Sequence, residues 1–516
     1  MTAKTDDTRV DLYAYYALAI LFLVYVLNFI DRQILAILAD DIKRDLNLTD
    51  GDIGFLYGTA FGVFYALFGI PLGRLADSWR RVRLMSLGLA LWSAMTALSG
   101  FARSGLSLTT ARIGVGIGEA TASPAAYSLI SDWFPRRLRA TALAIYSSGI
   151  YIGGGLSLFI GGLIVEKWNA AYPAGSGPLG LAGWQAAFLA VGVPGLLLAI
   201  LVATMREPLR GQSEGVTVAQ TPPSADGFMQ ELVNTIPPFT VIGAARRGWR
   251  ALLGNLAALL IIAFLVALLT IGLQEPPAQW ASVGIGLYAV YSWASALRDR
   301  DPTTFALTFG NRAFVCVVVA YGLNAFISYA VSGFAPSYAR RTFGLSADEV
   351  GLLVGLPAAV AGFVGVTLGG RVADWLRQRH AAGRIIVLLF GSIVPPIFIV
   401  SAFTTGSPAV FFVMNVLIVM TASSALGAAA ATTQDLVLPR MRGGATAIFF
   451  VGTTLLGLAM GPYLAGRISH LTGDLAVGLM SLLASVPIAC LAGFFAWRLV
   501  PAAEARKNVI LVDESK

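Results

Sequence analysis

Residues 48–81 read LTDGDIGFLYGTAFGVFYALFGIPLGRLADSWRR, and residues 345–378 read LSADEVGLLVGLPAAVAGFVGVTLGGRVADWLRQ. Each stretch begins with a short polar run, continues through an apolar segment long enough for a membrane helix, and ends on Gly-Arg-x-Ala-Asp. The closing motif occupies 73–77 in the first stretch and 370–374 in the second, and one offset relates the two stretches without a gap. The chain therefore contains two copies of one helical unit.

This duplication indicates how the whole chain is organised. A chance match would not keep one offset across a membrane-length helix, and duplicated halves are typical of membrane proteins that rock around a central site. The composition agrees with a membrane location, because 57% of the 516 residues are hydrophobic and only 12% are charged. Soluble domains carry about 25% charged residues. We therefore expect an all-α integral membrane protein.

Fourteen apolar stretches are long enough to span a bilayer, which takes roughly 20 residues each. The repeat accounts for twelve of them, as two six-helix pseudo-repeat bundles, and an extra two-helix hairpin lies between the bundles. The predicted parts are an N-terminal bundle over 12–205, a cytoplasmic linker over 206–250, the extra transmembrane hairpin over 251–297, a C-terminal bundle over 305–500 and a cytoplasmic tail over 501–516.

The basic residues set the expected orientation in the membrane. With the N-terminus inside, four basic clusters face the cytoplasm: Arg80-Arg81-x-Arg83, Arg136-Arg137-x-Arg139, Arg246-Arg247 and Arg377-x-Arg379. We predict a multi-pass protein integral to the plasma (inner) membrane, with both termini cytoplasmic. The same skew accounts for the net charge of +8, so nucleic-acid binding is not needed to explain that charge.

Two segments outside the bundles are informative. Residues 1–11 are charged and lead into a helix too long for a cleavable signal, so we expect the first helix to be retained. The linker contains Pro222-Pro223 and Pro237-Pro238, and its stretch 228–242 has the pattern of a short helix on the membrane surface.

The residues that an enzyme or a metal site would need do not stand out. His380 and His470 lie at helix ends, and no metal-ligand spacing is visible, so we expect neither a metal nor any cofactor apart from coupling protons. Cys316 and Cys490 lie far apart in apolar helices, which indicates no disulfide framework. The glycines at 114–118 lie within a spanning helix with no strand before it, so they do not form a nucleotide-binding loop.

Two predicted helices carry charge inside the membrane: Asp31-Arg32 in the first helix, and Arg112 with Glu119 in the fourth. An embedded charge costs several kcal/mol and is usually paired or functional. At about 1.5 Å per residue, Asp31 and Arg112 both lie roughly 10 Å below the outer boundary, so an Asp31–Arg112 pair is geometrically feasible. Glu119 lies about two turns deeper on the face of Arg112, and Asn28 shares the face of Asp31.

Two interpretations of these charges are open. In the structural one, Asp31 and Arg112 form a static pair and Glu119 is a satisfied buried acid. In the functional one, burial favours the neutral acids while Arg112 favours the carboxylates, so a proton or an anionic substrate changes the partner of Arg112. Arg32 either reaches a central cavity between the halves or pairs with Asp31. We favour the functional interpretation. The second half has no embedded acid, and its candidate cavity-lining residues are Asn324, Asn415, Ser423 and Ser424.

The repeated motif also supplies candidate residues for a cytoplasmic gate. The first-half candidates are Gly73, Asp77, Arg80, Arg81 and Asp132, and those of the second half are Gly370, Asp374, Arg377 or Arg379, and Asp435. We expect Asp77 to accept hydrogen bonds from a helix N-terminus of the opposite half, and Arg80 or Arg81 to bridge to Asp132. The alternative is a set of solvated loop charges that only set orientation, which does not require the duplicated glycine and acid spacing.

These residues resemble the signature of the major facilitator superfamily. The run Arg112-x-x-x-Gly116-x-Gly118-Glu119-Ala120 is similar to the helix 4 motif that the family associates with proton coupling, and the glycine-rich stretch 149–162 is similar to its antiporter motif. More narrowly, the chain resembles spinster-like transporters over about 12–210 and 305–500. That likeness is carried by Asn28-x-x-Asp31-Arg32, the Arg112 to Glu119 spacing, Arg206-Glu207-Pro208 and Pro439-x-x-Arg442-Gly443.

The resemblance implies a proton-coupled secondary active transporter that alternates access to a cavity between its halves. It implies that Asp31, Arg112 and Glu119 form the coupling and headgroup site for an amphiphilic, anionic, lipid-like molecule, because eukaryotic spinster-like members export lysolipids and sphingosine phosphate. Organic-anion symporters and multidrug antiporters of the same superfamily are the alternatives, and a non-transporting substrate sensor is an alternative of another class. We expect a monomer whose partners are the substrate and the lipid bilayer.

Overall fold

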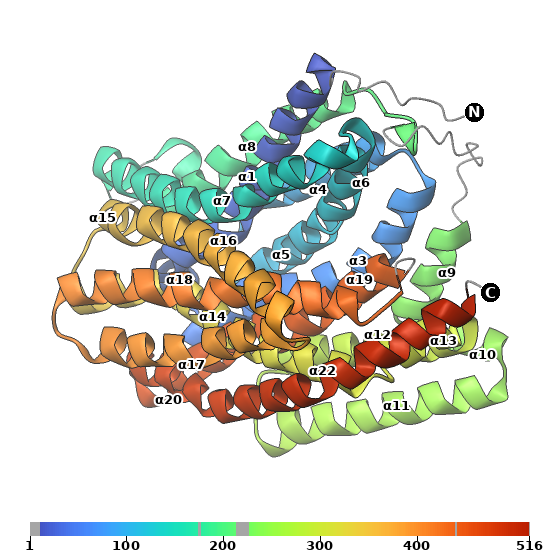
Figure 1. The fold of residues 1–516 in the computed structure, drawn as a ribbon. Helices are drawn as coiled ribbons and strands as arrows, with labels where there is room; N and C mark the ends of the chain where they lie inside the picture. The colour runs from blue at the N-terminus through green and yellow to red at the C-terminus, as the bar shows by residue number, and fades with distance from the viewer. Residues whose placement is uncertain (1–10, 174–176, 213–225, 439–440, 515–516) are drawn as a thin grey trace.

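The computed structural model describes residues 11–173, 177–212, 226–438 and 441–514. The described residues form helices and their connections (Figure 1). Three features named from the sequence lie outside the described residues: the charged segment 1–10, Pro222-Pro223 and Pro439. The side chains of Arg136 and Arg137 are outside the description as well.

The N-terminal half contains six long helical rods, two of which are divided. The rods are α1 (Leu12–Leu46), α2–η1–α3 (Asp50–Gly54, Phe55–Thr59, Ala60–Ser78), α4 (Arg81–Ser99), α5–α6 (Gly105–Glu119, Ala122–Trp133), α7 (Arg136–Ala171) and α8 (Gly183–Ala203), with a short turn η3 (Pro178–Gly180) before α8.

The C-terminal half repeats this plan. Its rods are α14 (Arg312–Phe343), α15–η6–α16 (Ala347–Val350, Gly351–Gly355, Leu356–Arg379), α17 (Gly383–Thr404), α18 (Pro408–Asp435), α19–η8–α20 (Arg442–Thr453, Thr454–Leu458, Gly461–Thr472) and α21–η9–α22 (Leu475–Ser481, Leu482–Ser485, Val486–Glu514). The quoted repeat forms the second rod of each half, and both copies begin with a capping box, at Thr49 and at Ser346.

The described residues between the halves form five helices. They are α9 (Asp226–Thr235), α10 (Phe239–Arg247), α11 continued by η5 (Trp249–Ala267, Leu268–Gly272), α12 (Pro277–Arg300) and α13 (Pro302–Leu307). The single surface helix expected over 228–242 is instead split into α9 and α10, because Pro237 and Pro238 lack backbone donors and interrupt the helix.

Twelve helices of the described chain are long and apolar enough to cross a membrane, against fourteen predicted stretches. The two rods outside that set are α5–α6 and α12. The first is divided at Ala120 and Thr121 into helices of 15 and 12 residues and carries Arg112 and Glu119. The second, α12, packs against α3 and α9, whereas α11 is largely exposed.

The two ends of the molecule differ in what they carry (Figure 1). The helices α9 and α10 and the last turns of α22 lie at one end, which we call the linker end. The junctions between α1 and α2 and between α14 and α15 lie at the opposite end, which we call the distal end. The contact surface between the two halves is called the seam.

Glycines let the halves approach closely in the distal part of the seam. A Cβ at Gly58 would lie 2.2 Å from the carbonyl oxygen of Leu458, and one at Gly162 would lie 2.2 Å from that of Ala347. Contact between α7 and α16 extends as far as Tyr151 and Gly362. Beyond that point, Gly365 and Gly369 of α16 face α18 of their own half. The seam is therefore closed at the distal end.

We expect Gly58→Ala to open the distal seam, because a backbone carbonyl cannot move away as a flexible side chain can. Overpacking of this kind costs about 1–3 kcal/mol, which changes a two-state ratio by roughly ten- to a hundredfold. Distances between spin labels at the distal end would measure the change. Gly69→Ala on the same rod is the matched control, since a Cβ there meets nothing within 4 Å. Equal distance distributions for the two variants would contradict the expectation.

Candidate functional site

Arg32 and Glu119 form the ion pair at the centre of the N-terminal half. The Nη2 atom of Arg32 donates to Oε2 of Glu119 at 2.9 Å, and Nε donates to the same oxygen at 3.3 Å. The side chains are 8% and 0% exposed. The guanidinium carbon also lies 4.6–4.9 Å from the ring centres of Phe29, Phe61 and Tyr65. A buried cation thus has one carboxylate and three aromatic faces as partners.

This pairing differs from the one considered from the sequence, in which Asp31 and Arg112 share a salt bridge. Arg112 donates instead to the backbone carbonyl of Asp31, at 3.1 Å, and its guanidinium lies 5.4 Å from the Phe61 ring. The carboxylate oxygens of Asp31 have no hydrogen-bond partner among the described residues. Arg112 thus meets the first helix at the level of Asp31, but neighbouring residues project about 100° apart, so Asp31 and Arg32 point to different faces.

Arg32 is the embedded charge nearest the seam. The next residue, Gln33, donates to Ser332 of α14 at 3.4 Å, and the hydroxyl of Tyr57 donates to the Gln33 side chain. Tyr329 of α14 is another neighbour of Arg32. Asp31, Arg112 and Glu119 are 0–1% exposed. Sequence reasoning missed Gln33, Tyr57 and Ser332, because nothing in one half of a sequence marks which residues of the other half it will meet.

Asn28 lies beside Glu119, one turn before Asp31 and Arg32. Its side chain is buried, and its amide nitrogen has no hydrogen-bond partner among the described residues. A carboxamide at this position can donate to either oxygen of Glu119 after a small rotation. Asn28 therefore belongs to the same polar group as Arg32 and Glu119.

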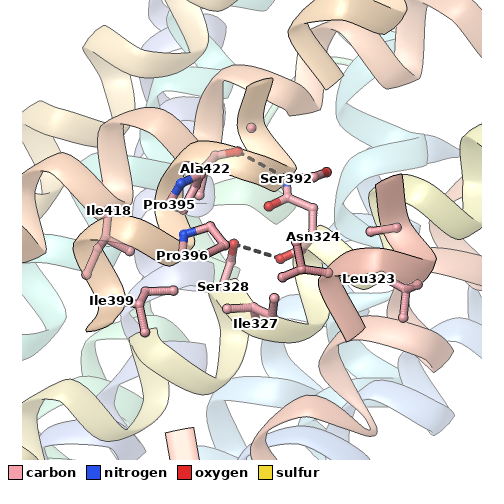
Figure 2. A pocket seen from close by; sticks show the side chains of 13 residues that line it. Leu323, Asn324, Ile327, Ser328, Ser392, Pro395, Pro396, Ile399, Ile418 and Ala422 are labelled. Atoms are coloured by element: carbon pink, nitrogen blue, oxygen red, sulfur yellow. Dashed lines mark hydrogen bonds between the residues drawn. The ribbon is translucent and has the colours of Figure 1, made fainter. Parts of the chain in front are cut away.

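The predicted lining residues of the C-terminal half occupy the interior of that half. Asn324 donates to the carbonyl of Ala422 at 3.2 Å and borders a small cavity beside Ser392 and the proline pair of α17 (Figure 2). The cavity volume is about 10 Å³, close to the space of one water molecule. Asn324 thus lines a cavity among α14, α17, α18 and α22 and not, as expected, one between the halves.

The other predicted lining residues also lie within the C-terminal half. Ser423 donates to the carbonyls of Gly362 and Met420, and Ser424 donates to that of Thr421. Asn415 is buried at 3% exposure. These hydroxyls therefore satisfy helix carbonyls of their own half.

At the linker end of the N-terminal half, Arg81 makes the most hydrogen bonds and ion pairs of the gate candidates in that half. It pairs with Asp132, donates to Glu207 at 2.8 Å, and also bonds Ser128 and the carbonyl of Pro208. The sequence left Arg80 and Arg81 as alternatives for the bridge to Asp132. In the structure Arg81 makes this bridge, whereas Arg80 is exposed. Glu207 was noted only as part of a family motif.

Asp77 does not reach the opposite half in this arrangement. It is exposed, and its charged neighbours are Arg74 and Arg210 of the same half and its extension. Arg210 donates to the carbonyls of Ala76 and Trp79 at 2.8 Å and so closes the end of α3. Burial lowers the pKa of Arg210, and the nearby Arg81 adds to this effect.

The C-terminal half rebuilds this gate with a different arginine. Arg384 pairs with Asp374 at 2.9 Å and with Asp435, while Arg377 bonds Glu504 at 2.7 Å and lies 3.8 Å from Asp435. In the second copy of the repeat, the residue equivalent to Arg81 is Gln378, which has no charge. The ion pair with the acid is therefore made by Arg384, at the start of the next rod. Arg379 stacks on Trp375 instead of bridging. Gly73 and Gly370 face no side chain or backbone of the opposite half within 4 Å.

A charge network at the distal end joins the halves and was missed by sequence reasoning. Arg340 pairs with Asp41 at 2.9 Å, and Arg341 pairs with Asp40 at 2.5 Å and with Asp50 at 2.8 Å. Ser469 donates to Asp50 at 2.9 Å. The signal available was the doublets Asp40-Asp41 and Arg340-Arg341 at the ends of corresponding helices. Among the described residues, the ion pairs that join the two halves lie at the distal end, whereas those of the gate candidates at the linker end stay within one half and its extension.

The protein is thus a duplicated bundle pair that is closed distally, with a buried charge pair beside the seam. A family model described as Major Facilitator Superfamily matches residues 21–289, 233–462 and 317–512. The chain belongs to the Major Facilitator Superfamily. It is a multi-pass membrane transporter of that superfamily and not an enzyme.

Three comparisons place the chain within the superfamily. An MFS-type efflux pump of Mycolicibacterium smegmatis is 28% identical over 463 residues, which cover 90% of this chain and 86% of the relative. Protein spinster of Drosophila melanogaster is 28% identical over 201 residues, which cover 39% of this chain and 31% of that protein. A crystal structure of a bacterial homolog to the human lysosomal transporter Spinster, inward-facing and occupied, matches with a TM-score of 0.64 at 24% identity over 96% of this chain and 95% of that chain. The spinster-like resemblance and the fold are therefore confirmed.

Proposed function

We propose that the protein is a proton-coupled transporter of an amphiphilic molecule with an anionic headgroup. The observation that carries the proposal is the buried Arg32–Glu119 pair, because Arg32 is the embedded cation nearest the seam and its charge partner is a protonatable acid. Embedded ionisable groups of this kind are functional by default in membrane proteins.

The coupling follows from competition for one guanidinium. While Glu119 is ionised, it holds Arg32 at 2.9 Å. A proton on Glu119 removes the negative charge, and Arg32 is then left as a buried cation without a charge partner. An anionic headgroup entering from the seam can satisfy Arg32, and its departure favours the return of the Glu119 carboxylate. The Glu119 carboxylate and the anionic headgroup thus compete for Arg32, so binding of a proton to Glu119 raises the affinity for the substrate, and binding of the substrate raises the affinity for the proton.

The surroundings of Arg32 favour an amphiphile over a small polar anion. Phe29, Phe61 and Tyr65 cover the guanidinium, and Tyr57 and Tyr329 lie beside it. Such aromatic walls leave few donors for a hydroxyl-rich molecule and suit an acyl or ring system next to a charged group. The spinster-like resemblance supports the same class.

A second candidate is proton-driven efflux of hydrophobic compounds. It is favoured by the likeness to an MFS-type efflux pump over 90% of the chain. The two candidates share the Arg32–Glu119 mechanism and differ in the need for an anionic group on the substrate.

We also propose that the linker end is cytoplasmic, which places the closed distal end of the seam on the outer side of the membrane. Basic residues gather there, at Arg74, Arg81, Arg210, Arg377 and Arg384, and the positive-inside tendency favours that side. The closed distal network then acts as the gate on the outer side.

The test uses proteoliposomes with an imposed proton gradient and a matched substrate pair, a lysophosphatidic acid and the monoacylglycerol with the same acyl chain. A sugar acid and a cationic dye complete the panel. We expect flux of the phosphate-bearing lipid and little flux of its neutral counterpart. Flux of the dye alone would favour the efflux candidate, and binding without flux of any compound would identify a sensor.

Arg32→Lys should weaken binding of the lysophosphatidic acid by about tenfold or more, because lysine keeps the charge but loses the planar fork and the ring stacking. Arg32→Gln should weaken it further. Binding measured by calorimetry would check both variants. Arg103→Gln, an exposed arginine at the distal end, is the control and should bind normally. Equal losses of affinity for the phosphate-bearing and the neutral lipid would show that Arg32 does not bind the anionic headgroup.

A further inference from the structure

The hairpin formed by α11 and α12 lies against the seam and has no part in the site described above. At Gly286 of α12, a Cβ would lie 2.9 Å from Cδ2 of Leu455 in the C-terminal half and 3.4 Å from Cγ1 of Val63 in the N-terminal half. Nearer the tip of the hairpin, Gln279 is 1% exposed and donates to the carbonyl of Ala459 at 3.5 Å. The helix α12 therefore contacts both halves where they meet, on the side of the seam formed by α3 and η8.

The base of the hairpin is fastened to the N-terminal half. The helix α12 packs more extensively against α3 and α9 than against η8, and α9 itself packs on α3. Arg300, the last residue of α12, pairs with Glu231 of α9 at 2.6 Å, and the Glu231 side chain is 7% exposed. A Cβ at Gly227 of α9 would lie 3.2 Å from Nε of Arg74 in α3. We therefore expect the base to follow the N-terminal half when the halves rock.

The tip of the hairpin is fastened to the C-terminal half by one acid. Glu275 pairs with Arg467 of α20 at 3.1 Å and accepts a hydrogen bond from the hydroxyl of Tyr463 at 2.7 Å. The same helix closes the distal seam, because a Cβ at Gly466 of α20 would lie 2.1 Å from the carbonyl oxygen of Asp50 in α2. Glu275 thus holds the helix that must leave α2 when the distal end opens.

The two fastenings cannot both persist while the halves rock. Opening of the distal end moves α20 away from α2, and α2 continues through η1 into α3, on which the base of the hairpin packs. At the base, Ala289, Trp293 and Leu297 of α12 are buried in an apolar core that includes residues of α3. At the tip, the side chains of Arg467 and Glu275 are 22% and 19% exposed. Since a partly exposed ion pair contributes less than buried apolar packing, the tip is the fastening that yields.

We infer that the α11–α12 hairpin is a strap that latches the distally closed arrangement, with Glu275 as the latch residue. The base stays on α3 and α9, and the Glu275–Arg467 pair breaks as α20 leaves α2. The pair therefore stabilises the distally closed arrangement alone. This latch acts for any substrate and needs no proton, so it goes beyond the proposed function.

A double-mutant cycle in the full-length protein tests the latch. Spin labels at Arg103 and Thr404, exposed distal positions in different halves, report distal opening. Glu275→Gln and Arg467→Gln should each raise the ratio of distally open to distally closed protein about threefold. The double variant should raise it no further, because both changes remove one interaction. The latch is refuted if Glu275→Gln leaves the ratio unchanged, or if the double variant shows the sum of the two single effects.

The matched control is Asp299→Asn. Asp299 is also an acid of α12, but its partner Arg247 lies on α10, in the same segment between the halves. Its loss should therefore leave the ratio as it is in the parent protein. A rise equal to that of Glu275→Gln would mean that any loss of charge on the hairpin opens the distal end, and it would overturn the assignment of Glu275.

A label at the tip distinguishes a strap from a hairpin that moves with the C-terminal half. Leu273 at the tip and Leu471 on α20 are both exposed. In Glu275→Gln, the distance from Leu273 to Arg103 should stay constant, while the distance from Leu273 to Leu471 should increase. The reverse pattern would show that the hairpin moves with α20 and would contradict the strap. Neither measurement uses a substrate or a proton gradient, so the result stands apart from that of the proposed function.

Discussion

Glu119→Gln should abolish proton-driven net flux in proteoliposomes while leaving substrate exchange in place. Glutamine is neutral and nearly isosteric, so it imitates the protonated acid permanently and cannot recapture Arg32 by ionising. The variant binds the anionic substrate at Arg32 and carries it in both directions. It cannot bind and release the coupling proton, because it has lost the acid. We expect the component of flux that depends on the proton gradient to fall to the level of empty liposomes.

The measurement is uptake of labelled lysophosphatidic acid with and without a proton gradient, followed by counterflow without one. Glu166→Gln, a partly exposed acid near the distal end of α7, is the matched control and should keep full coupling. A Glu119→Gln protein that retains pH-dependent net flux would remove Glu119 from the mechanism. Loss of exchange as well as net flux would indicate a structural defect, which a melting curve would detect.

Arg341→Gln should shift the protein toward an arrangement that is open at the distal end. Arg341 bonds both Asp40 and Asp50 across the seam, and the Asp50 side chain is only 5% exposed, whereas that of Arg341 is 32% exposed. A half-buried network of this kind contributes about 1–3 kcal/mol, between the values for surface and buried pairs. Its loss should change the ratio of the two arrangements by roughly ten- to a hundredfold.

The matched control is Arg384→Gln. Arg384 also bonds two carboxylates and lies in the same half, but its partners Asp374 and Asp435 belong to that half as well. Its loss should therefore cost stability without opening the distal seam. Spin labels at Arg103 and Thr404, two exposed distal positions in different halves, would report the distance. The interpretation of the distal network as a gate fails if the two variants give the same distribution.

Much of the architecture could be predicted because it depends on properties local to the sequence. The repeat at 48–81 and 345–378 predicts the two-bundle fold, since matching glycine and acid spacing marks equivalent helices. The embedded charges stood out against apolar helices for the same reason, since hydrocarbon penalises each of them.

The pairing of those charges could not be predicted. Sequence position gives the depth of Asp31 and Arg112, but the choice between Asp31 and Arg32 as the seam residue depends on how α1 rotates about its axis. That rotation is set by packing against α7, where Gly149 and Gly153 meet the backbone and side chains of Tyr25, Val26 and Phe29. The partners of Gln33 and Arg341 come from the other half, so no pattern within one half indicates them.

The linker end shows a further reason why a repeat is an incomplete guide. The acid at the end of the fourth rod is retained as Asp132 and Asp435, but its arginine partner moves from the position of Arg81 to that of Arg384. The interaction is preserved while the residue that makes it shifts to the start of a neighbouring helix. Residue-by-residue transfer between the halves therefore predicted Arg377, which lies 3.8 Å from Asp435, but missed Arg384, which is the closer partner of that acid.

The central claim is that protonation of Glu119 frees Arg32 and thereby biases the rocking of the two halves. The most direct test measures spin-label distances between Arg83 and Gln378, exposed residues at the linker end of opposite halves, at acidic and neutral pH. The account predicts a pH-dependent shift of the distance populations in the parent protein, and one fixed distribution in Glu119→Gln at both pH values. A Glu119→Gln protein that shifts with pH as the parent does would contradict the account.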